Sequence, residues 1–102
     1  MQDKSSLSGR TAIVTGAARG IGRAIAEAMH DAGANVVIAD IAGDTAASTA
    51  ADLGARALAV EGDVANAAQV ADAVAQTVVE FGGVDILVNN AGADKAVPIL
   101  EM

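Results

Sequence analysis

Three glycines, Gly16, Gly20 and Gly22, are spaced G-x-x-x-G-x-G between an apolar run and a segment of helical periodicity. A turn from a strand into a helix leaves backbone N–H groups free, and the helix dipole favours negative charge there, so phosphate binds readily at such a turn. We expect a side chain at Gly16 to obstruct the tight turn, one at Gly20 to keep the backbone away from a pyrophosphate, and one at Gly22 to separate helix from strand. Glycines also cluster in ordinary loops, but this strand-to-helix context favours a phosphate-binding loop.

An acidic residue, Asp40, closes the next apolar run, where its carboxylate can accept hydrogen bonds from the adenosine ribose hydroxyls of a dinucleotide. The same carboxylate would repel the 2′-phosphate of NADP. Arg19 in the glycine-rich loop argues the other way, because a guanidinium can hold a phosphate in two-point contact. Ile41 supplies no second cation, so the sequence favours NAD over NADP. The plainer alternatives are that Asp40 only ends a strand and that Arg19 is a solvated loop charge.

Two further polar positions have weaker signals. Asp63 and Val64 follow the third apolar run, where they could offer a carboxylate to an adenine amino group and an apolar surface to its ring. That dipeptide alone means little. His30 lies about 180° from Ile21 on the predicted helix, so we expect it to be a solvated surface histidine.

The elements that must position these residues are strand-length apolar runs alternating with helical stretches. The runs are continuous rather than alternating, as expected of parallel strands covered on both faces. The predicted strands are Thr11–Thr15, Asn35–Asp40, Ala57–Glu61 and Val84–Asn89.

Three helices are predicted between these strands. The first ends at Gly33, the second covers residues 44–53, and the third begins after an N-cap at Asn66 and stops at Gly82. Their expected buried faces are, in chain order, Ile21, Ile25, Ala28 and Ala32; Ala47, Ala50 and Ala51; and Val70, Val74, Val78 and Phe81.

This alternation predicts an α/β fold, a Rossmann-type parallel sheet with right-handed crossovers. We expect four strands in the order 3-2-1-4, numbered along the chain, and three helices, two on one face of the sheet and one on the other. Residues 1–102 are then a single dinucleotide-binding domain whose sheet is incomplete after the fourth strand, truncated there and left with an open edge.

Composition excludes several classes of function. The net charge of −7 would repel a nucleic-acid backbone, so we expect no nucleic-acid partner. The chain has no cysteine and one histidine, which leaves no disulfide and no ordinary zinc site and fits a reducing, cytoplasmic setting. No apolar run approaches the roughly 18 residues of a membrane span, so we expect no membrane partner.

The segment T-G-A-A-R-G-I-G at residues 15–22, together with Asp40, the D-V pair and D-I-L-V-N-N-A-G at residues 85–92, resembles the short-chain dehydrogenase/reductase family. The resemblance is strongest to the branch that includes the 3-oxoacyl-carrier-protein reductases and related alcohol and sugar dehydrogenases. It implies that residues 16–22, among them Ala18, Arg19 and Ile21, hold the pyrophosphate of the cofactor.

The same resemblance implies that Asp40, followed by Ile41, contacts the adenosine ribose and that Asp63 and Val64 contact the adenine. It also implies that three residues after the last strand line the nicotinamide-side ribose and stiffen the sheet. These residues are Asn90, Ala91 and Gly92. The preceding residue, Asn89, also has a plainer interpretation, because an asparagine at a strand end often only satisfies neighbouring backbone groups.

The catalytic residues of that family have no match here. The family uses an Asn on the next helix, a Ser after a fifth strand and a Tyr-x-x-x-Lys pair, in which the tyrosine is the general acid/base and the serine positions the carbonyl. This chain has no tyrosine. We therefore expect a homo-oligomeric NAD(P)-dependent oxidoreductase of carbonyl or alcohol substrates, represented here by its cofactor-binding portion and inactive by itself. The alternative is a stand-alone nucleotide-binding or assembly module without chemistry.

Overall fold

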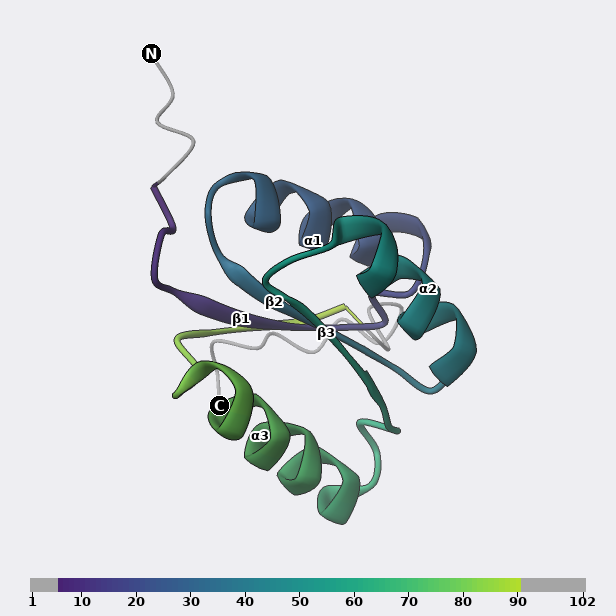
Figure 1. Ribbon diagram of the computed structural model, residues 1–102. Helices are drawn as coiled ribbons and strands as arrows, with labels where there is room; N and C mark the ends of the chain where they lie inside the picture. The colour runs from purple at the N-terminus through teal and green to yellow at the C-terminus, as the bar shows by residue number, and fades with distance from the viewer. Residues whose placement is uncertain (1–5, 91–102) are drawn as a thin grey trace.

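A computed structural model describes residues 6–90 as a four-stranded sheet with helices on both faces (Figure 1). The elements in chain order are β1 (Thr11–Thr15), α1 (Gly20–Asp31), β2 (Asn35–Asp40), α2 (Gly43–Leu53), β3 (Ala57–Glu61), α3 (Ala67–Phe81) and β4 (Ile86–Asn89). The strand order is β3-β2-β1-β4 and every pairing is parallel. The predicted α/β class, strand order and number of helices are confirmed.

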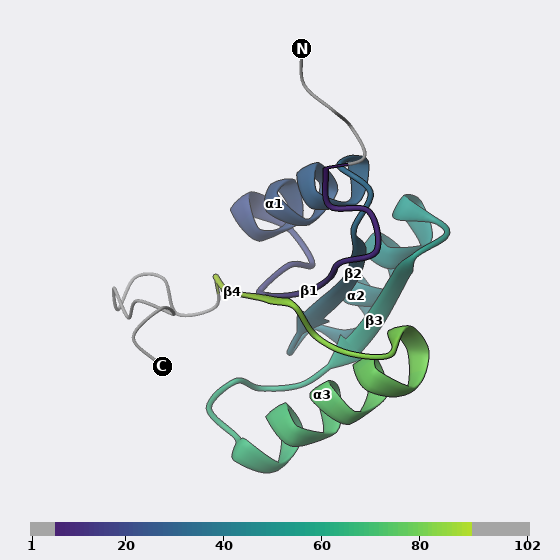
Figure 2. The same cartoon turned by 90° about the vertical axis from the view of Figure 1, so that its left-hand side faces the viewer.

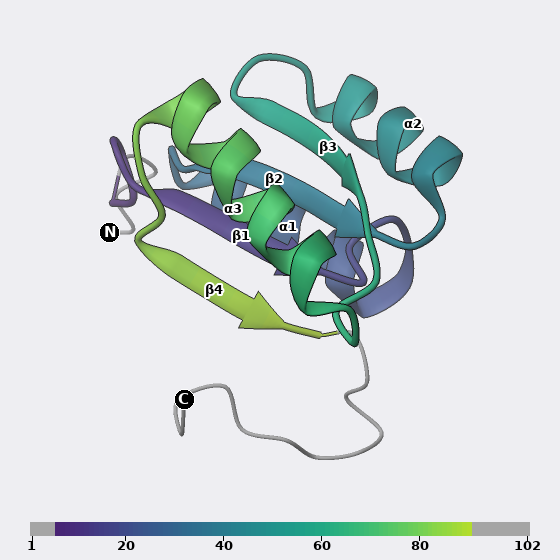
Figure 3. The same cartoon turned by 90° about the horizontal axis from the view of Figure 1, so that it is seen from below.

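The parallel register brings the carboxyl ends of the strands to one edge of the sheet (Figure 3). Thr15, the last residue of β1, is paired with Ala39 on one side and with Asn89 on the other. The chain runs outward from β1 through β2 to β3 and then returns to the far side of β1 as β4. Ligands of open α/β sheets bind outside the carboxyl ends of the strands at such a reversal.

The inner strands are buried on both faces, and successive side chains alternate between two apolar clusters. Val14 and Ile38 pack with the cluster under α1 and α2, whereas Ile13 and Val37 belong to the cluster under α3. Figure 1 shows α1 and α2 on one side of the sheet and α3 alone on the other. The predicted division of the helices between the two faces is thus confirmed.

The predicted buried face of α1 is only partly right: Ile25 packs against the core, but Ile21 and Ala28 do not belong to the buried face. Gly22 and Ala26 are the buried residues, whereas Ile21 is 74% exposed and Ala28 also faces outward. The reason is a close approach of α1 to the loop before it: a Cβ on Gly22 would meet the Gly16 carbonyl group. The face of α1 that carries Gly22 must therefore be the one that packs against the loop.

The buried face of α2 differs in a similar way. Ala46, Thr49 and Ala50 are buried, whereas Ala47 and Ala51 are exposed. In a helix this rich in alanine the hydrophobic contrast between faces is small, so a single buried hydrogen bond can decide the rotation. Thr49 forms that bond with a backbone carbonyl, as described below.

His30 lies at the surface, as predicted, but it is partly covered and has a hydrogen-bond partner. Its Nε2 atom lies 2.6 Å from the carbonyl oxygen of Ala55, in the turn after α2. The histidine therefore joins the end of α1 to the connection between α2 and β3.

The bounds of α3 agree with the prediction, but its predicted apolar face is only partly covered. Asn66 caps the helix by accepting a hydrogen bond from the Gln69 N–H at 3.1 Å, and Gly82 ends it with a left-handed φ of +90°. Thr77 is its one buried residue, while Val70 and Val74 are both 40% exposed. No helix within residues 6–90 is long and apolar enough to cross a membrane.

The last strand is shorter than predicted, because β4 begins at Ile86 and not at Val84. The preceding residue, Asp85, pairs with β1 partly through its side chain. Its N–H donates to the Thr11 carbonyl at 2.9 Å, and its carboxylate accepts from the Thr11 N–H at 2.9 Å. The regular ladder of backbone hydrogen bonds therefore starts at Ile86, two residues after the predicted start at Val84.

Candidate functional site

The glycine-rich loop leaves β1 at Thr15 and enters α1 at Gly20, at the reversal point of the sheet. Gly16 and Gly20 have φ values of +63° and +66°, which favour glycine because L-residues are strained in that region. At Gly22 an added Cβ would lie 2.8 Å from the Gly16 carbonyl carbon and 2.6 Å from the Asn90 amide nitrogen. Gly22 therefore allows close packing, whereas an added Cβ on Gly20 would meet no described atom within 4 Å.

Hydrogen bonds from three other elements fix the first part of this loop. The Asp40 carboxylate, at the end of β2, accepts from the Ala18 N–H at 3.1 Å. Thr49, on α2, donates its hydroxyl to the Ala18 carbonyl at 2.6 Å. Asn90, after β4, donates to the Gly16 carbonyl at 3.2 Å, and Figure 2 shows the end of β4 beside this loop. The loop is thus held by side chains from both neighbouring strands and from a helix.

The second part of the loop presents backbone donors without partners. The first helical hydrogen bond of α1 runs from the Arg23 N–H to the Arg19 carbonyl at 3.4 Å. Within the part of the chain that the structure describes, the N–H groups of residues 19–22 have no acceptor, and Arg19 makes no side-chain cap bond. Four free N–H groups at a helix N-terminus form a site for an anion.

Asp40 holds two loops at once. Besides the Ala18 N–H, its carboxylate accepts from the Ala42 N–H at 2.9 Å. A carboxylate has about four lone-pair positions on its two oxygens, so it can accept further hydrogen bonds from a ligand. Ile41, the next residue, is 67% exposed beside it.

The two arginines near the loop have different surroundings. Arg19 is exposed, and among residues 6–90 its guanidinium makes no ion pair or hydrogen bond. Arg23 bonds Glu27 and Asp52 at 3.0 Å each. The hydrogen bond with Glu27, and next that with Asp52, raise the pKa of Arg23 above its usual value. Arg19 is therefore the cation available to an anionic ligand, and Arg23 is a structural one.

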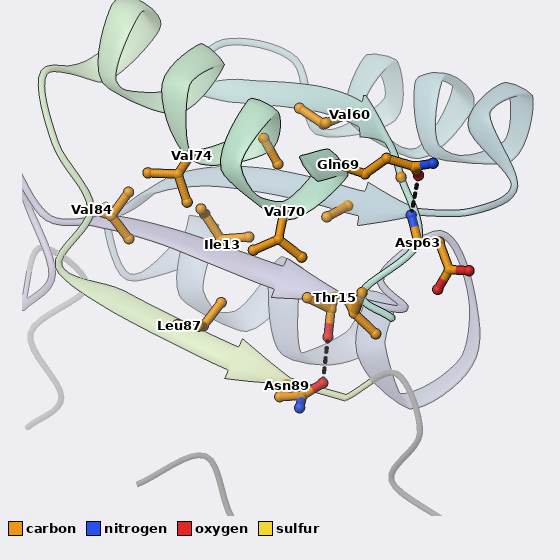
Figure 4. Close-up of a pocket in the computed structure, with 14 residues that line it drawn as sticks. Ile13, Thr15, Val60, Asp63, Gln69, Val70, Val74, Val84, Leu87 and Asn89 are labelled. Atoms are coloured by element: carbon orange, nitrogen blue, oxygen red, sulfur yellow. Dashed lines mark hydrogen bonds between the residues drawn. The ribbon is translucent and has the colours of Figure 1, made fainter. Parts of the chain in front are cut away.

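On the α3 side of the sheet, an apolar cleft of about 210 Å³ opens beside the carboxyl ends of β1 and β4 (Figure 4). Val70 and Val74 of α3 point into it across from Ile13 and Leu87 of the sheet. Its side walls are otherwise mostly apolar. Its polar residues are Thr15, Asp63, Gln69 and Asn89.

Asp63 and Val64 border this cleft, in the connection between β3 and α3. The Asp63 side chain accepts from the Ala65 N–H at 2.9 Å, and its own N–H donates to the Gln69 side chain at 2.7 Å. Val64 is 42% exposed. The pair therefore lies at an open rim where a flat ring could rest.

Asn89 has a side-chain partner rather than the backbone partners expected for it. The Thr15 hydroxyl lies 3.1 Å from its Oδ1 atom and 3.3 Å from the Val88 carbonyl. Asn90, by contrast, reaches the glycine-rich loop. Ala91 and Gly92, which the family resemblance assigns with Asn90 to the nicotinamide-side ribose, lie outside the described residues.

Sequence reasoning missed Thr49 and Gln69. For Gln69 a signal existed, because Asn66 and Gln69 have the spacing of a capping box. Gln69 reaches back past the cap to the Asp63 N–H. For Thr49 no local signal exists, since it bonds a residue in a loop far away along the chain. Residues 6–90 contain no cluster of three or more acidic or histidine side chains that could hold a metal ion.

The arrangement offers free backbone donors to an anion and, beside them, the Asp40 carboxylate as an acceptor. Comparison with known proteins shows which family the sequence resembles. The family model described as short chain dehydrogenase matches residues 10–102. The chain is 48% identical over 96 residues to sorbitol dehydrogenase of Cereibacter sphaeroides, covering 94% of this chain and 38% of that protein. It is 50% identical over 94 residues to galactitol 2-dehydrogenase of Agrobacterium fabrum, covering 91% and 36% respectively.

Solved structures give the same picture. A 3-ketoacyl-(acyl-carrier-protein) reductase from Brucella melitensis, complexed with NADH, superposes with a TM-score of 0.78 at 41% identity, over 80% of this chain and 34% of that one. A hydroxysteroid dehydrogenase from Escherichia coli gives a TM-score of 0.83 at 38% identity, over 89% and 39%. The chain therefore spans between about a third and two-fifths of the length of these proteins.

Proposed function

The chain belongs to the short-chain dehydrogenase family, and from this we propose that it carries the dinucleotide-binding portion of an NAD-dependent oxidoreductase acting on alcohol or carbonyl groups. The observation that carries the proposal is the set of four free backbone N–H groups at residues 19–22, at the reversal point of the sheet. Pyrophosphate oxygens accept hydrogen bonds from such groups, and the helix dipole adds to the attraction.

The loop also has room for this group. Because an added Cβ on Gly20 meets nothing within 4 Å, the backbone there is open to a ligand. Gly16 and Gly22 act behind it, where they let the loop turn and pack against α1. Ala18 and Ile21 complete the loop, and the exposed Arg19 adds a positive charge beside it. The residues present therefore fit a pyrophosphate.

The remaining contacts follow from the arrangement around the loop. Asp40 can accept hydrogen bonds from the adenosine ribose hydroxyls without giving up the Ala18 N–H, and its charge disfavours a 2′-phosphate. Asp63 and Val64 border the cleft where adenine would rest. Asn90, together with Ala91 and Gly92, is assigned to the nicotinamide-side ribose by the family resemblance.

In this proposal the chain binds and orients a cofactor, and NAD, when bound, supplies the hydride acceptor. The proton transfer that accompanies hydride removal from an alcohol needs a general base. Because the 102 residues contain no tyrosine, they do not match the family's acid/base. Two relatives are named for polyols, sorbitol and galactitol, which supports an alcohol as the substrate class. The reductase complexed with NADH supports NAD as the cofactor.

Calorimetric titration with NADH and NADPH tests this function. We expect NADH to bind more tightly, and we expect Asp40→Ala to reduce or reverse the preference. Asp72→Ala is the matched control, because Asp72 is an exposed carboxylate on α3 whose one hydrogen-bond partner among residues 6–90 is Gln76. It should change neither affinity. Tighter binding of NADPH to the unmutated chain would contradict the role of Asp40. Failure of both dinucleotides to bind would contradict the function as a whole.

A further inference from the structure

We propose that Thr49 is a positioning residue for the pyrophosphate of the dinucleotide, although it lies on α2 and not in the glycine-rich loop. Its hydroxyl orients the peptide group between Ala18 and Arg19, so that the Arg19 N–H faces the ligand. This inference rests on the proposed function and names a residue that neither the motifs nor the family resemblance assigned.

The contact itself is short and shielded from water. Thr49 is completely buried, and its Oγ1 atom lies 2.6 Å from the Ala18 carbonyl oxygen. Ala18 is buried as well. Water therefore cannot replace either partner of this hydrogen bond. Loss of the Thr49 hydroxyl would leave the Ala18 carbonyl buried without a donor, which costs free energy.

The hydroxyl is also held in a single role. Arg23 donates from its Nη1 atom to Thr49 Oγ1 at 3.3 Å, and a guanidinium can only donate. The hydroxyl oxygen thus accepts from Arg23, and its one hydrogen goes to the Ala18 carbonyl. Arg23 is in turn fixed by Glu27 and Asp52. A rotatable hydroxyl becomes a donor of fixed direction.

Fixing the Ala18 carbonyl fixes the next N–H. The peptide group is planar and trans, so the C=O of Ala18 and the N–H of Arg19 point in opposite directions. With the carbonyl turned toward α2, the Arg19 N–H must point away from α2. The Ala18 N–H is removed from the ligand by Asp40. The two side chains together decide which amides of the loop remain free.

Matched substitutions separate this role from a general loss of structure. Thr49→Val keeps the shape and removes the hydroxyl, whereas Thr49→Ser keeps the hydroxyl. Thr77→Val is the control, because Thr77 is also fully buried and also donates to a backbone carbonyl, that of Ala73 at 2.7 Å, but on α3. We expect Thr49→Val to weaken NADH binding about tenfold, Thr49→Ser to restore it to within about twofold, and Thr77→Val to leave it unchanged.

A ligand without phosphate makes the test specific. Adenosine, titrated by NMR chemical shifts, should bind Thr49→Val as well as it binds the unmutated chain, because it does not contact the Arg19 N–H. Equal loss of adenosine and NADH affinity, or NADH affinity unchanged in Thr49→Val, would overturn the proposal. The unmutated chain provides a measurement that needs no variant: added NADH should shift the Arg19 amide proton downfield and leave that of Ala18 in place.

The two proposals fail in different ways. If the unmutated chain binds no NADH, the proposed function is wrong. If it binds NADH but the Arg19 amide proton does not move, only the role of Thr49 is wrong.

Discussion

Replacing Gly20 by valine places a branched side chain in the open space in front of the glycine-rich loop. No described atom lies within 4 Å of the Cβ position, so the added Cβ itself meets no packed atom. Its cost to the fold comes from φ at +66°, in the left-handed region. We expect the free energy of unfolding to fall by roughly 1–2 kcal/mol from that strain, which corresponds to a lower Tm by about 5–15 °C in a domain of this size.

The effect on binding is larger and has a separate cause. The side chain would stand between the pyrophosphate and the free N–H groups at residues 19–22. A hydrogen bond to a charged group contributes about 1.5–3 kcal/mol, so losing two of them weakens NADH binding by more than roughly a hundredfold. Circular dichroism should still show the α/β spectrum, since no packed atom is displaced.

Gly82→Val is the matched control for backbone strain. Gly82 has a φ of +90° and also no atom within 4 Å of its Cβ position, but it lies at the end of α3. We expect a comparable loss of Tm and unchanged NADH affinity. If Gly20→Val binds NADH as tightly as Gly82→Val does, the loop does not hold the pyrophosphate and the reasoning above is refuted.

Other substitutions test the remaining parts of the structure. Gly22→Ala should lower both stability and NADH affinity, because its Cβ collides with the Gly16 carbonyl group; an unchanged melting curve would contradict that packing. Asn66→Ala should cost about 1 kcal/mol in urea unfolding through loss of its cap bond, and Asn66→Asp should retain most of it. Within the described sheet β4 pairs only with β1, so its other edge is open and should make the chain self-associate in sedimentation experiments. Leu87→Lys places a charge beside that edge and should reduce the association. A strictly monomeric unmutated chain would contradict this prediction. NADH-coupled absorbance assays on simple alcohols and ketones should detect no turnover by the 102 residues alone; measurable turnover would show that the missing tyrosine is not required.

Much of the fold follows from local signals in the chain. Asn66 and Gly82 predict the bounds of α3 because capping and left-handed termination involve only residues a few positions apart. The apolar runs predict the four strands for a similar reason, since strands of a doubly covered sheet need apolar residues in succession. The three glycines of the loop also lie within seven residues of the chain, so their spacing alone indicated a tight strand-to-helix connection. The strand order follows from the Rossmann-type class, whose usual order begins 3-2-1-4, and not from a local signal.

Tertiary packing decided which faces of α1 and α2 are buried and how the loop is held. On α1, apolar periodicity could not show that Gly22, rather than Ile21, turns inward, because a glycine gives no apolar signal; the contact with Gly16 determines it. On α2, the alanines give nearly equal faces, so periodicity could not show which of them are buried. The bonds from Asp40, Thr49 and Asn90 to the loop join residues far apart in the chain. Such contacts exist only once the sheet has brought the ends of its strands together, and therefore no local pattern in the sequence encodes them.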